Sequence, residues 1–302
     1  MELLDKQKNI QHLAGIIPIG GQPLELNMPW HDCLMPIGPD YLAIEKAVIQ
    51  CAYAGCETIW IVGHLGTQPI VRKRVGDLII DPTRLFKTFT AYQQMKEISV
   101  YYVPIHPKDR GKRDCLGWSV LYGADSAFRI SKFISKWIAP EKFFCSFPHG
   151  LIPDETLHEN RLLLSSRENV LFSYDGKTVK DNIHMPFTFD AEDFFRCRDI
   201  VKFKQASEWG KTSARFYDLA TVFKGLDTAT STVLNLPWFH DISTWSGYRN
   251  YMASEQSKTL VKPNKLFKGN RRKPYERNNP SNDNPANEAK NTEQERGTEK
   301  TE

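Results

Sequence analysis

Short apolar runs alternate with stretches of helical spacing along the first half of the chain. The runs are continuous and rich in β-branched residues, as in strands covered on both faces. They span residues 15–19, 57–63, 98–104 and 142–148. Between them, residues 41–54, 68–79 and 117–137 carry apolar side chains at helical spacing, and Gly55 stands where the first helix would stop. This order predicts an α/β fold with a mostly parallel central sheet and helices on both faces.

The alternation becomes weaker after Asp154, and it ends near Leu266. Asp175-Gly176 is a two-residue turn signal between strand-like flanks and predicts a hairpin. Beyond Leu266 the chain has few apolar residues, so it cannot bury enough surface to offset its ordering entropy. We therefore expect one globular domain over residues 1–262 and a disordered, polar and charged tail over residues 263–302.

Charge and cysteine usage narrow the class of protein only slightly. Forty Lys and Arg against 36 Asp and Glu give a net charge of +4, too small to indicate a nucleic-acid binder. The first part of the tail is basic, so contact with a nucleic acid or a protein is one interpretation, and a solvated tail without a partner is the other.

The six cysteines lack the spacing of a zinc site and are typical of reduced, intracellular thiols. No stretch of about 18 apolar residues occurs, so we expect a cytoplasmic protein with no membrane partner.

The carboxyl ends of the predicted strands are the expected place for a ligand, because open α/β sheets bind ligands there. Three loops meet this condition, at residues 20–37, 63–68 and 148–154. The first begins with Gly20-Gly21, and such a turn lets backbone N–H groups approach phosphates closely. The same turn, between two prolines, also suits a rigid structural bend.

Several segments follow one another in an order that indicates a family. GIIPIGG (15–21) is followed by CLMPIG (33–38) and by YLAIEKAVIQCAYAGCETIWIVG (41–63). LGWSVLYGADSA (116–127) and WFHDISTWSGY (238–248) come later. Over residues 13–255 this order resembles the sugar-1-phosphate nucleotidyltransferases, which have a GT-A-like α/β fold. The chain is also similar in general appearance to proteins of some tailed phages.

The resemblance implies a nucleotide or nucleotide-sugar partner. In the family, a sugar-1-phosphate attacks the α-phosphorus of an NTP and releases pyrophosphate, with Mg²⁺ held by carboxylates. By the resemblance, Gly20 and Gly21 fall on the phosphate loop, and Gly117 falls on the turn before the nucleotide-side helix. Asp241 falls on an aspartate that helps to hold Mg²⁺.

Three departures change the expected chemistry. The glycine loop lacks the family's arginine, and Asp32 stands where the family has a lysine, which inverts the charge beside a triphosphate. His149 follows the strand that would end in the first metal aspartate, and it suits a transition-metal ligand, a general base or a plain loop histidine. Lys108, Arg110 and Arg113 form a basic loop that is either a solvated surface loop or a replacement for the missing anion clamp.

These observations lead to three hypotheses. The first is a nucleotidyltransferase-like protein that binds a nucleotide or nucleotide-sugar, with transfer activity altered or absent. The second is a non-catalytic structural or interaction protein that keeps the fold. The third is an active transferase whose cation clamp is the basic loop. The candidate catalytic residues are Asp241, Asp32 and His149.

Overall fold

The computed structural model describes residues 10–21, 24, 26–84, 96–207, 217–263 and 267–268. The chain divides into two compact units, residues 1–269 and 270–302, and the second unit lies outside the described residues. Most of the predicted tail, residues 263–302, lies outside the described residues, so its predicted disorder and partners stay predictions. Of its described residues, Phe267 and Lys268 form a short strand that pairs with the main sheet. All that follows concerns the first unit.

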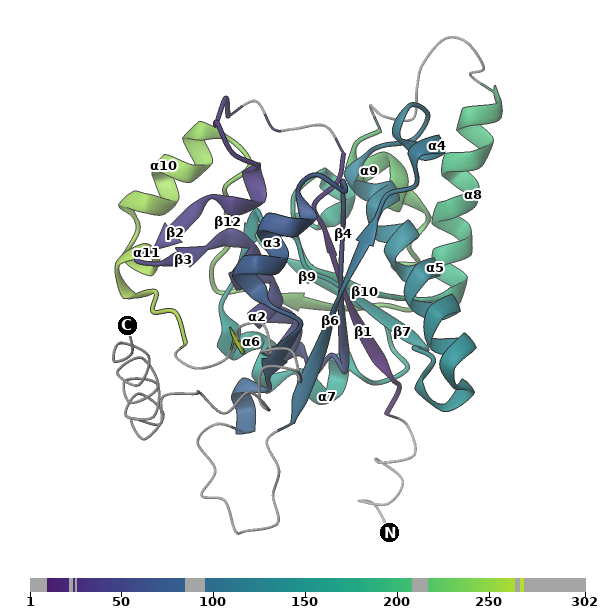
Figure 1. Ribbon diagram of the computed structural model, residues 1–302, viewed down its shortest axis with the longest axis horizontal. Coiled ribbons are helices and arrows are strands. Elements are labelled where there is room, and N and C mark those ends of the chain that lie inside the picture. Colours follow the sequence, from purple (N-terminus) through teal and green to yellow (C-terminus); the bar gives the residue numbers. More distant parts are fainter. Residues whose placement is uncertain are drawn as a thin grey trace, which may run out of the picture. The chain divides into compact units, whose positions relative to one another are not determined.

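A nine-stranded sheet runs through the described part of this unit (Figure 1). Its strands, in spatial order, are β11 (Thr232–Asn235), β9 (Val170–Ser173), β10 (Phe187–Asp190), β7 (Lys142–Cys145), β1 (Leu13–Pro18), β4 (Thr58–Gly63), β6 (Glu97–Pro104), β5 (Leu78–Ile80) and β13 (Phe267–Lys268). Only β10 and β5 run against the other described strands. The predicted mostly parallel sheet is confirmed.

Helices cover both faces of the sheet, as predicted, and the central strand shows how. All six residues of β1 are buried. A Cβ on Gly15 would lie 2.8 Å from Cys51 Sγ, in α2 (Ala43–Ala54), whereas the next residue, Ile16, packs on Gly123 of α5 (Leu116–Ile134). Successive side chains of a strand point to opposite faces, so α2 and α5 lie on opposite faces of β1.

The remaining helices are short apart from α8, which packs beside α5. They are α3 (Gln68–Val75), α4 (Pro107–Arg110), α6 (Asp154–Glu159), α7 (Arg161–Leu164), α8 (Ala191–Ser207), α9 (Leu219–Val222), α10 (Trp245–Ala253) and α11 (Glu255–Thr259). Single 3-10 turns are η1 (Asp32–Leu34), η2 (Pro82–Arg84), η3 (Lys136–Ile138), η4 (Val179–Asp181) and η6 (Phe223–Gly225).

Two local predictions differ from the structure. The second predicted helix, residues 68–79, extends only as far as Val75, because Gly76 ends it and β5 begins two residues later. The turn at Asp175-Gly176 forms with φ of 50° and 73°, but only the bridge between Tyr174 and Lys177 follows it. The second flank forms η4, and β9 pairs with β10 and β11 instead.

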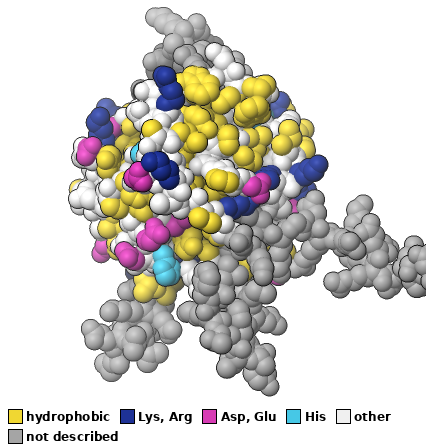
Figure 2. Space-filling view, turned by 90° about the vertical axis from the view of Figure 1, so that its left-hand side faces the viewer, with side chains coloured by type: hydrophobic (Ala, Val, Ile, Leu, Met, Phe, Trp, Pro, Cys, Tyr) yellow, Lys and Arg dark blue, Asp and Glu magenta, His cyan; other side chains and the backbone are white. Residues whose placement is uncertain are grey.

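A smaller layer lies beside the main sheet and has its own apolar core. It contains two two-stranded sheets, β2 (Pro36–Gly38) with β3 (Tyr41–Leu42), and β12 (His240–Asp241) with β8 (Gly150–Leu151). Helices α10 and α11 complete it (Figure 1). Figure 2 shows this face, on which apolar side chains gather, and α10 contributes the exposed Trp245 and Met252.

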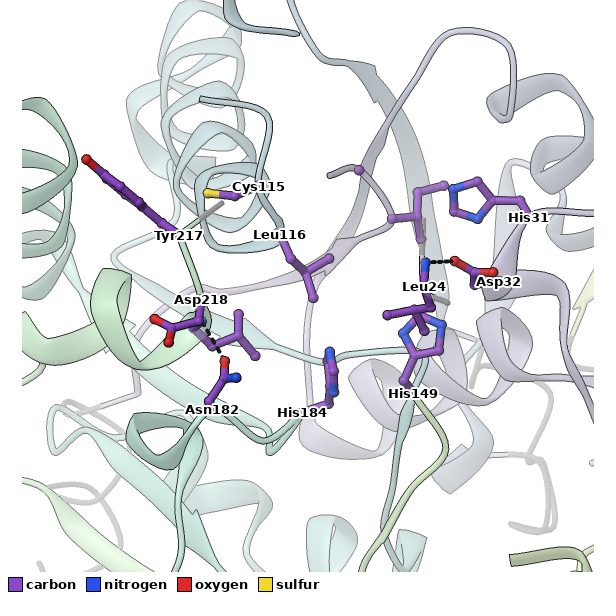
Figure 3. A pocket seen from close by; sticks show the side chains of 13 residues that line it. Leu24, His31, Asp32, Cys115, Leu116, His149, Asn182, His184, Tyr217 and Asp218 are labelled. Atoms are coloured by element: carbon purple, nitrogen blue, oxygen red, sulfur yellow. Dashed lines mark hydrogen bonds between the residues drawn. The ribbon is translucent and has the colours of Figure 1, made fainter. Parts of the chain in front are cut away.

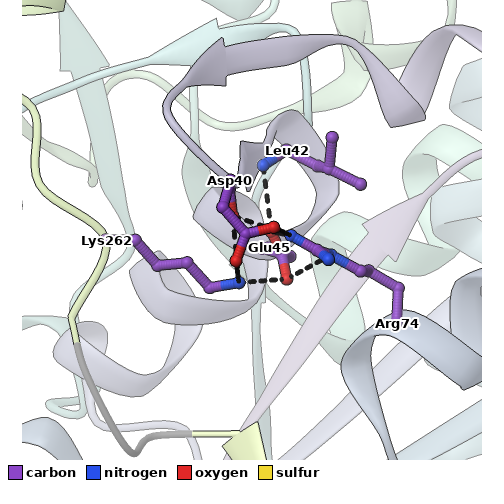
Figure 4. A network of polar contacts seen from close by, with 5 residues as sticks. All are labelled: Asp40, Leu42, Glu45, Arg74 and Lys262. Atoms are coloured by element: carbon purple, nitrogen blue, oxygen red, sulfur yellow. Dashed lines mark hydrogen bonds and ion pairs between the residues drawn. The ribbon is translucent and has the colours of Figure 1, made fainter.

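A charged cluster joins this layer to the main sheet (Figure 4). The Glu45 side chain is fully buried at the start of α2 and accepts a hydrogen bond from the backbone N–H of Leu42. Arg74 Nε of α3 lies 2.9 Å and Lys262 Nζ 2.8 Å from Glu45 Oε1. The exposed carboxylate of Asp40 contacts both cations from outside. One buried carboxylate therefore connects α2, α3 and the segment after α11.

We predict that Glu45→Gln lowers the free energy of unfolding by roughly 2–3 kcal/mol, because the two cations lose their buried countercharge. Urea unfolding measures this. Asp40→Asn is the matched control, since its carboxylate is exposed and its loss should leave the midpoint nearly unchanged. Equal unfolding midpoints for Glu45→Gln and the wild type would contradict the prediction.

Candidate functional site

A cavity of about 290 Å³ lies where β1 and β7 end and α5 begins (Figure 3). The residues that line it come from five separate segments of the chain. They are Ile19, Gly20, Leu24, His31, Asp32, Cys115, Leu116, His149, Asn182, His184, Tyr217, Asp218 and Leu219. Gly20, Asp32 and His149, which the sequence singles out, therefore share one cavity at the carboxyl edge of the sheet.

The glycine turn packs tightly against the start of α5. A Cβ on Gly20 would lie 2.6 Å from Ser119 Oγ of α5 and 2.2 Å from Ile105 Cδ1, and Gly21 has a φ of +91°. The N–H of Gly21 donates a hydrogen bond of 3.0 Å to the buried carboxylate of Asp114. The other oxygen of Asp114 lies 3.0 Å from His64 Nε2. The N–H of Gly21 therefore donates to a carboxylate of the protein. By the resemblance, this N–H would instead donate to a phosphate of the ligand.

We predict that Gly21→Ala lowers the free energy of unfolding by roughly 2 kcal/mol, because alanine is strained at positive φ. The new Cβ would also lie 2.9 Å from Leu116 N. Gly66→Ala is the control, because a Cβ there meets nothing within 4 Å, and its effect should stay within about 0.5 kcal/mol. Urea unfolding of both variants measures the difference, and equal losses would contradict it.

His149 faces the cavity without a hydrogen-bond partner among the described residues (Figure 3). The residue is only 5% exposed, and both ring nitrogens are buried. The backbone of Asp32 lies near the ring but not in hydrogen-bonding geometry. Burial, and then the neighbouring His184, lower the pKa of His149 to about 3, so the imidazole is neutral at pH 7. Buried polar groups are normally paired, so this ring is available to a ligand or a water molecule.

We predict that His149 makes the protein less stable in acid. The unfolded imidazole takes up a proton near pH 6.5, and the folded one does so only near pH 3, so stability falls as the pH drops through this window. The contribution between pH 7 and pH 5 is about 2 kcal/mol. Urea unfolding at several pH values should therefore show a flatter dependence for His149→Gln than for the wild type. Identical pH dependences for His149→Gln and the wild type would contradict the low pKa of His149.

Asp241 lies behind the cavity wall and holds His184, which lines the cavity. His184 Nδ1 is 2.9 Å from Asp241 Oδ2, and the backbone N–H of His184 donates to the same oxygen at 3.2 Å. The N–H of Ser243 donates to Oδ1 at 2.9 Å. Burial alone would raise the pKa of Asp241, but the contacts with His184 and Ser243 outweigh it and lower that pKa far below its usual range.

The residues present do not fit the Mg²⁺ site that the resemblance implies. Both oxygens of Asp241 already accept hydrogen bonds from the protein, and His149 is an imidazole where Mg²⁺ prefers oxygen. Within the described ranges, no group of three or more His, Cys, Asp or Glu side chains is placed to hold a metal ion.

The other predicted nucleotide-binding residues lie outside the cavity lining. Gly117, the second residue of α5, faces α9, since a Cβ on it would lie 2.8 Å from Val222. Lys108 and Arg110 belong to α4 and do not line the cavity. Arg113 pairs with Asp109 at 3.0 Å, and its guanidinium stacks 4.6 Å from the ring of Trp118. Arg113 therefore has structural partners.

Sequence reasoning missed the cavity wall formed by Asn182, His184, Tyr217 and Asp218. Asn182 has a φ of +62° at the end of η4, and its Oδ1 accepts the N–H of Leu219 at 2.9 Å. Asp218 caps α9 through the N–H of Thr221. None of these residues lies in a recognisable motif. The one local signal is Asn182, two positions before His184, because asparagine tolerates positive φ.

The comparisons with known proteins give the fold. No family model and no curated protein matches the chain. A protein assigned as a glucose-1-phosphate thymidylyltransferase from Bacillus anthracis, in complex with a sucrose, superimposes with a TM-score of 0.55 at 13% identity, covering 84% of this chain and 98% of that one. The chain shares this fold.

Two further solved structures are similar at lower scores. A 4-diphosphocytidyl-2C-methyl-D-erythritol synthase from Anaerococcus prevotii has a TM-score of 0.47 at 13% identity and covers 84% of this chain and 98% of its own. A UDP-glucose pyrophosphorylase from Acinetobacter baumanii also has a TM-score of 0.47 at 13% identity, covering 80% and 92%. The phage association has no support in the structures named above. No described helix is long and apolar enough to cross a membrane.

Proposed function

We propose that this protein binds a nucleotide or nucleotide-sugar in the cavity between the glycine turn and α5. The observation that carries the proposal is that Gly20, Leu116 and His149 line one cavity at the carboxyl edge of the sheet. Cys115 and Leu116 are the N-cap and the first residue of a 19-residue helix. The partial positive charge of that helix end favours an anionic group, and phosphates bind at such ends.

We infer that the usual transfer chemistry is altered or absent. Transfer of a nucleotidyl group requires several negative charges to be neutralised by cationic side chains or a metal. The described residues that line the cavity include two carboxylates, Asp32 and Asp218, and no Lys or Arg. Asp32 is buried and accepts the N–H of Leu24 at 2.6 Å, which supports a role in holding the loop.

A thermal-shift panel of NTPs, NDPs and NDP-sugars, with and without Mg²⁺, tests binding. A ligand at 100 times its Kd stabilises the folded state by about 2.7 kcal/mol, which raises the Tm by several degrees. We predict that Leu116→Trp abolishes this shift by filling the cavity, whereas Leu162→Trp, at a residue 72% exposed on α7, retains it.

The absence of any shift over the whole panel would favour the alternative, a structural or interaction protein that keeps the fold. Pyrophosphate release from NTPs and sugar-1-phosphates is measured on the same samples. Pyrophosphate release would contradict the inference that transfer chemistry is altered or absent. It would favour an active enzyme that uses the basic loop at Lys108, Arg110 and Arg113.

A further inference from the structure

The carboxylate of Asp241 is bound at both oxygens by donors of the protein. A carboxylate has about four lone-pair sites. Oδ2 accepts from His184 Nδ1 at 2.9 Å and from the His184 backbone N–H at 3.2 Å. Oδ1 accepts from the Ser243 N–H at 2.9 Å, and His184 Nδ1 lies 3.2 Å away. A cation at this carboxylate would compete with the backbone donors that hold β12 and the segment before β10.

These contacts determine which nitrogen of His184 carries the proton. An ionised carboxylate only accepts hydrogen bonds, so Nδ1 must be the donor toward Asp241. In the neutral imidazole the other nitrogen, Nε2, then has a free lone pair. His184 lies on the cavity wall between Asn182 and His149, and its ring centroid is 5.5 Å from that of His149 (Figure 3).

Besides this lone pair, the described lining of the cavity includes carboxylate acceptors. Asp32 and Asp218 contribute carboxylates, and no Lys or Arg of the described chain lines the cavity. A hydroxyl group of a ligand donates a hydrogen bond and carries no charge, so it fits this wall better than a phosphate does. The phosphate-favouring end of α5 lies on a separate segment of the lining, at Cys115 and Leu116.

We propose that Asp241 is a positioning residue that holds His184 in the Nδ1–H tautomer, so that Nε2 accepts a hydrogen bond from a ligand hydroxyl, and that binding requires no divalent cation at Asp241. This proposal rests on the proposed function for the identity of the ligand. The role of Asp241 does not depend on it, and it can be tested on the free protein.

The first experiment needs no ligand. Long-range ¹⁵N–¹H correlation spectra of ¹⁵N-histidine-labelled protein report which ring nitrogen carries the proton. We expect wild-type His184, assigned by its absence from spectra of His184→Gln, to be protonated at Nδ1, with Nε2 bare. A proton on Nε2 in the wild type, either in the Nε2–H tautomer or in an imidazolium, would overturn the proposal.

The second experiment uses a metal alone. Mn²⁺ is titrated into the wild type and into Asp241→Asn, and water proton relaxation measures its binding. We expect the two titrations to coincide. Saturable binding with a Kd below about 1 mM that Asp241→Asn removes would show that Asp241 holds a cation and would overturn the proposal.

The third experiment uses UDP-glucose as the probe, by calorimetry in EDTA and in Mg²⁺. We expect affinities that agree within about twofold, and a loss of about tenfold or more in His184→Gln. His158→Gln, an exposed imidazole outside the cavity lining, is the matched control. A tenfold weaker affinity in EDTA, or equal affinity of His184→Gln and the wild type, would overturn the proposal.

If no nucleotide or nucleotide-sugar binds under any condition, the proposed function fails, and with it the hydroxyl contact. The tautomer and the Mn²⁺ titration then still decide whether Asp241 positions His184 or holds a cation. The two failures are therefore distinguishable.

Discussion

The tight packing of helices on both faces of β1 is the constraint on which the rest of the structure depends. The strand is buried along its whole length, and glycines at its contacts with α2 and α5 allow the helices to approach closely. The backbone that follows β1 has little free space, because the side chains of Ile105 and Ser119 pack against the turn at Gly20. The start of α5 and the glycine turn therefore meet at one edge, and the cavity opens there.

Carboxylates around the cavity bind the protein's own backbone. Asp32 accepts the N–H of Leu24, Asp114 accepts that of Gly21, and Asp241 accepts those of His184 and Ser243. Each carboxylate closes a loop at the carboxyl edge of the sheet, where a phosphate-binding site would offer the same N–H groups to its ligand. Acidic groups thus hold the loops around the cavity, and the imidazoles of His31, His149 and His184 line it.

The fold was more predictable than the site. The apolar runs predict β1, β4, β6 and β7 closely, and Gly55 ends α2 in the left-handed conformation, with a φ of 95°. The hairpin at Asp175-Gly176 was wrong beyond its turn, because β9 gains more from pairing on both sides within the main sheet than from a short exposed ladder. Gly20 and His149 were found because both directly follow predicted strands.

The sequence by itself determined most of the order of helices and strands in the first half of the chain and the edge at which a cavity would form, because apolar periodicity and glycine stops act over a few neighbouring residues. The tertiary structure alone decided what the polar side chains do. Asp114 meets Gly21 across 93 positions of the chain, and Asp241 meets His184 across 57. Hydrogen bonds between such distant residues depend on three-dimensional packing and have no local pattern, so the partner of Asp241 could be known only once the chain had folded.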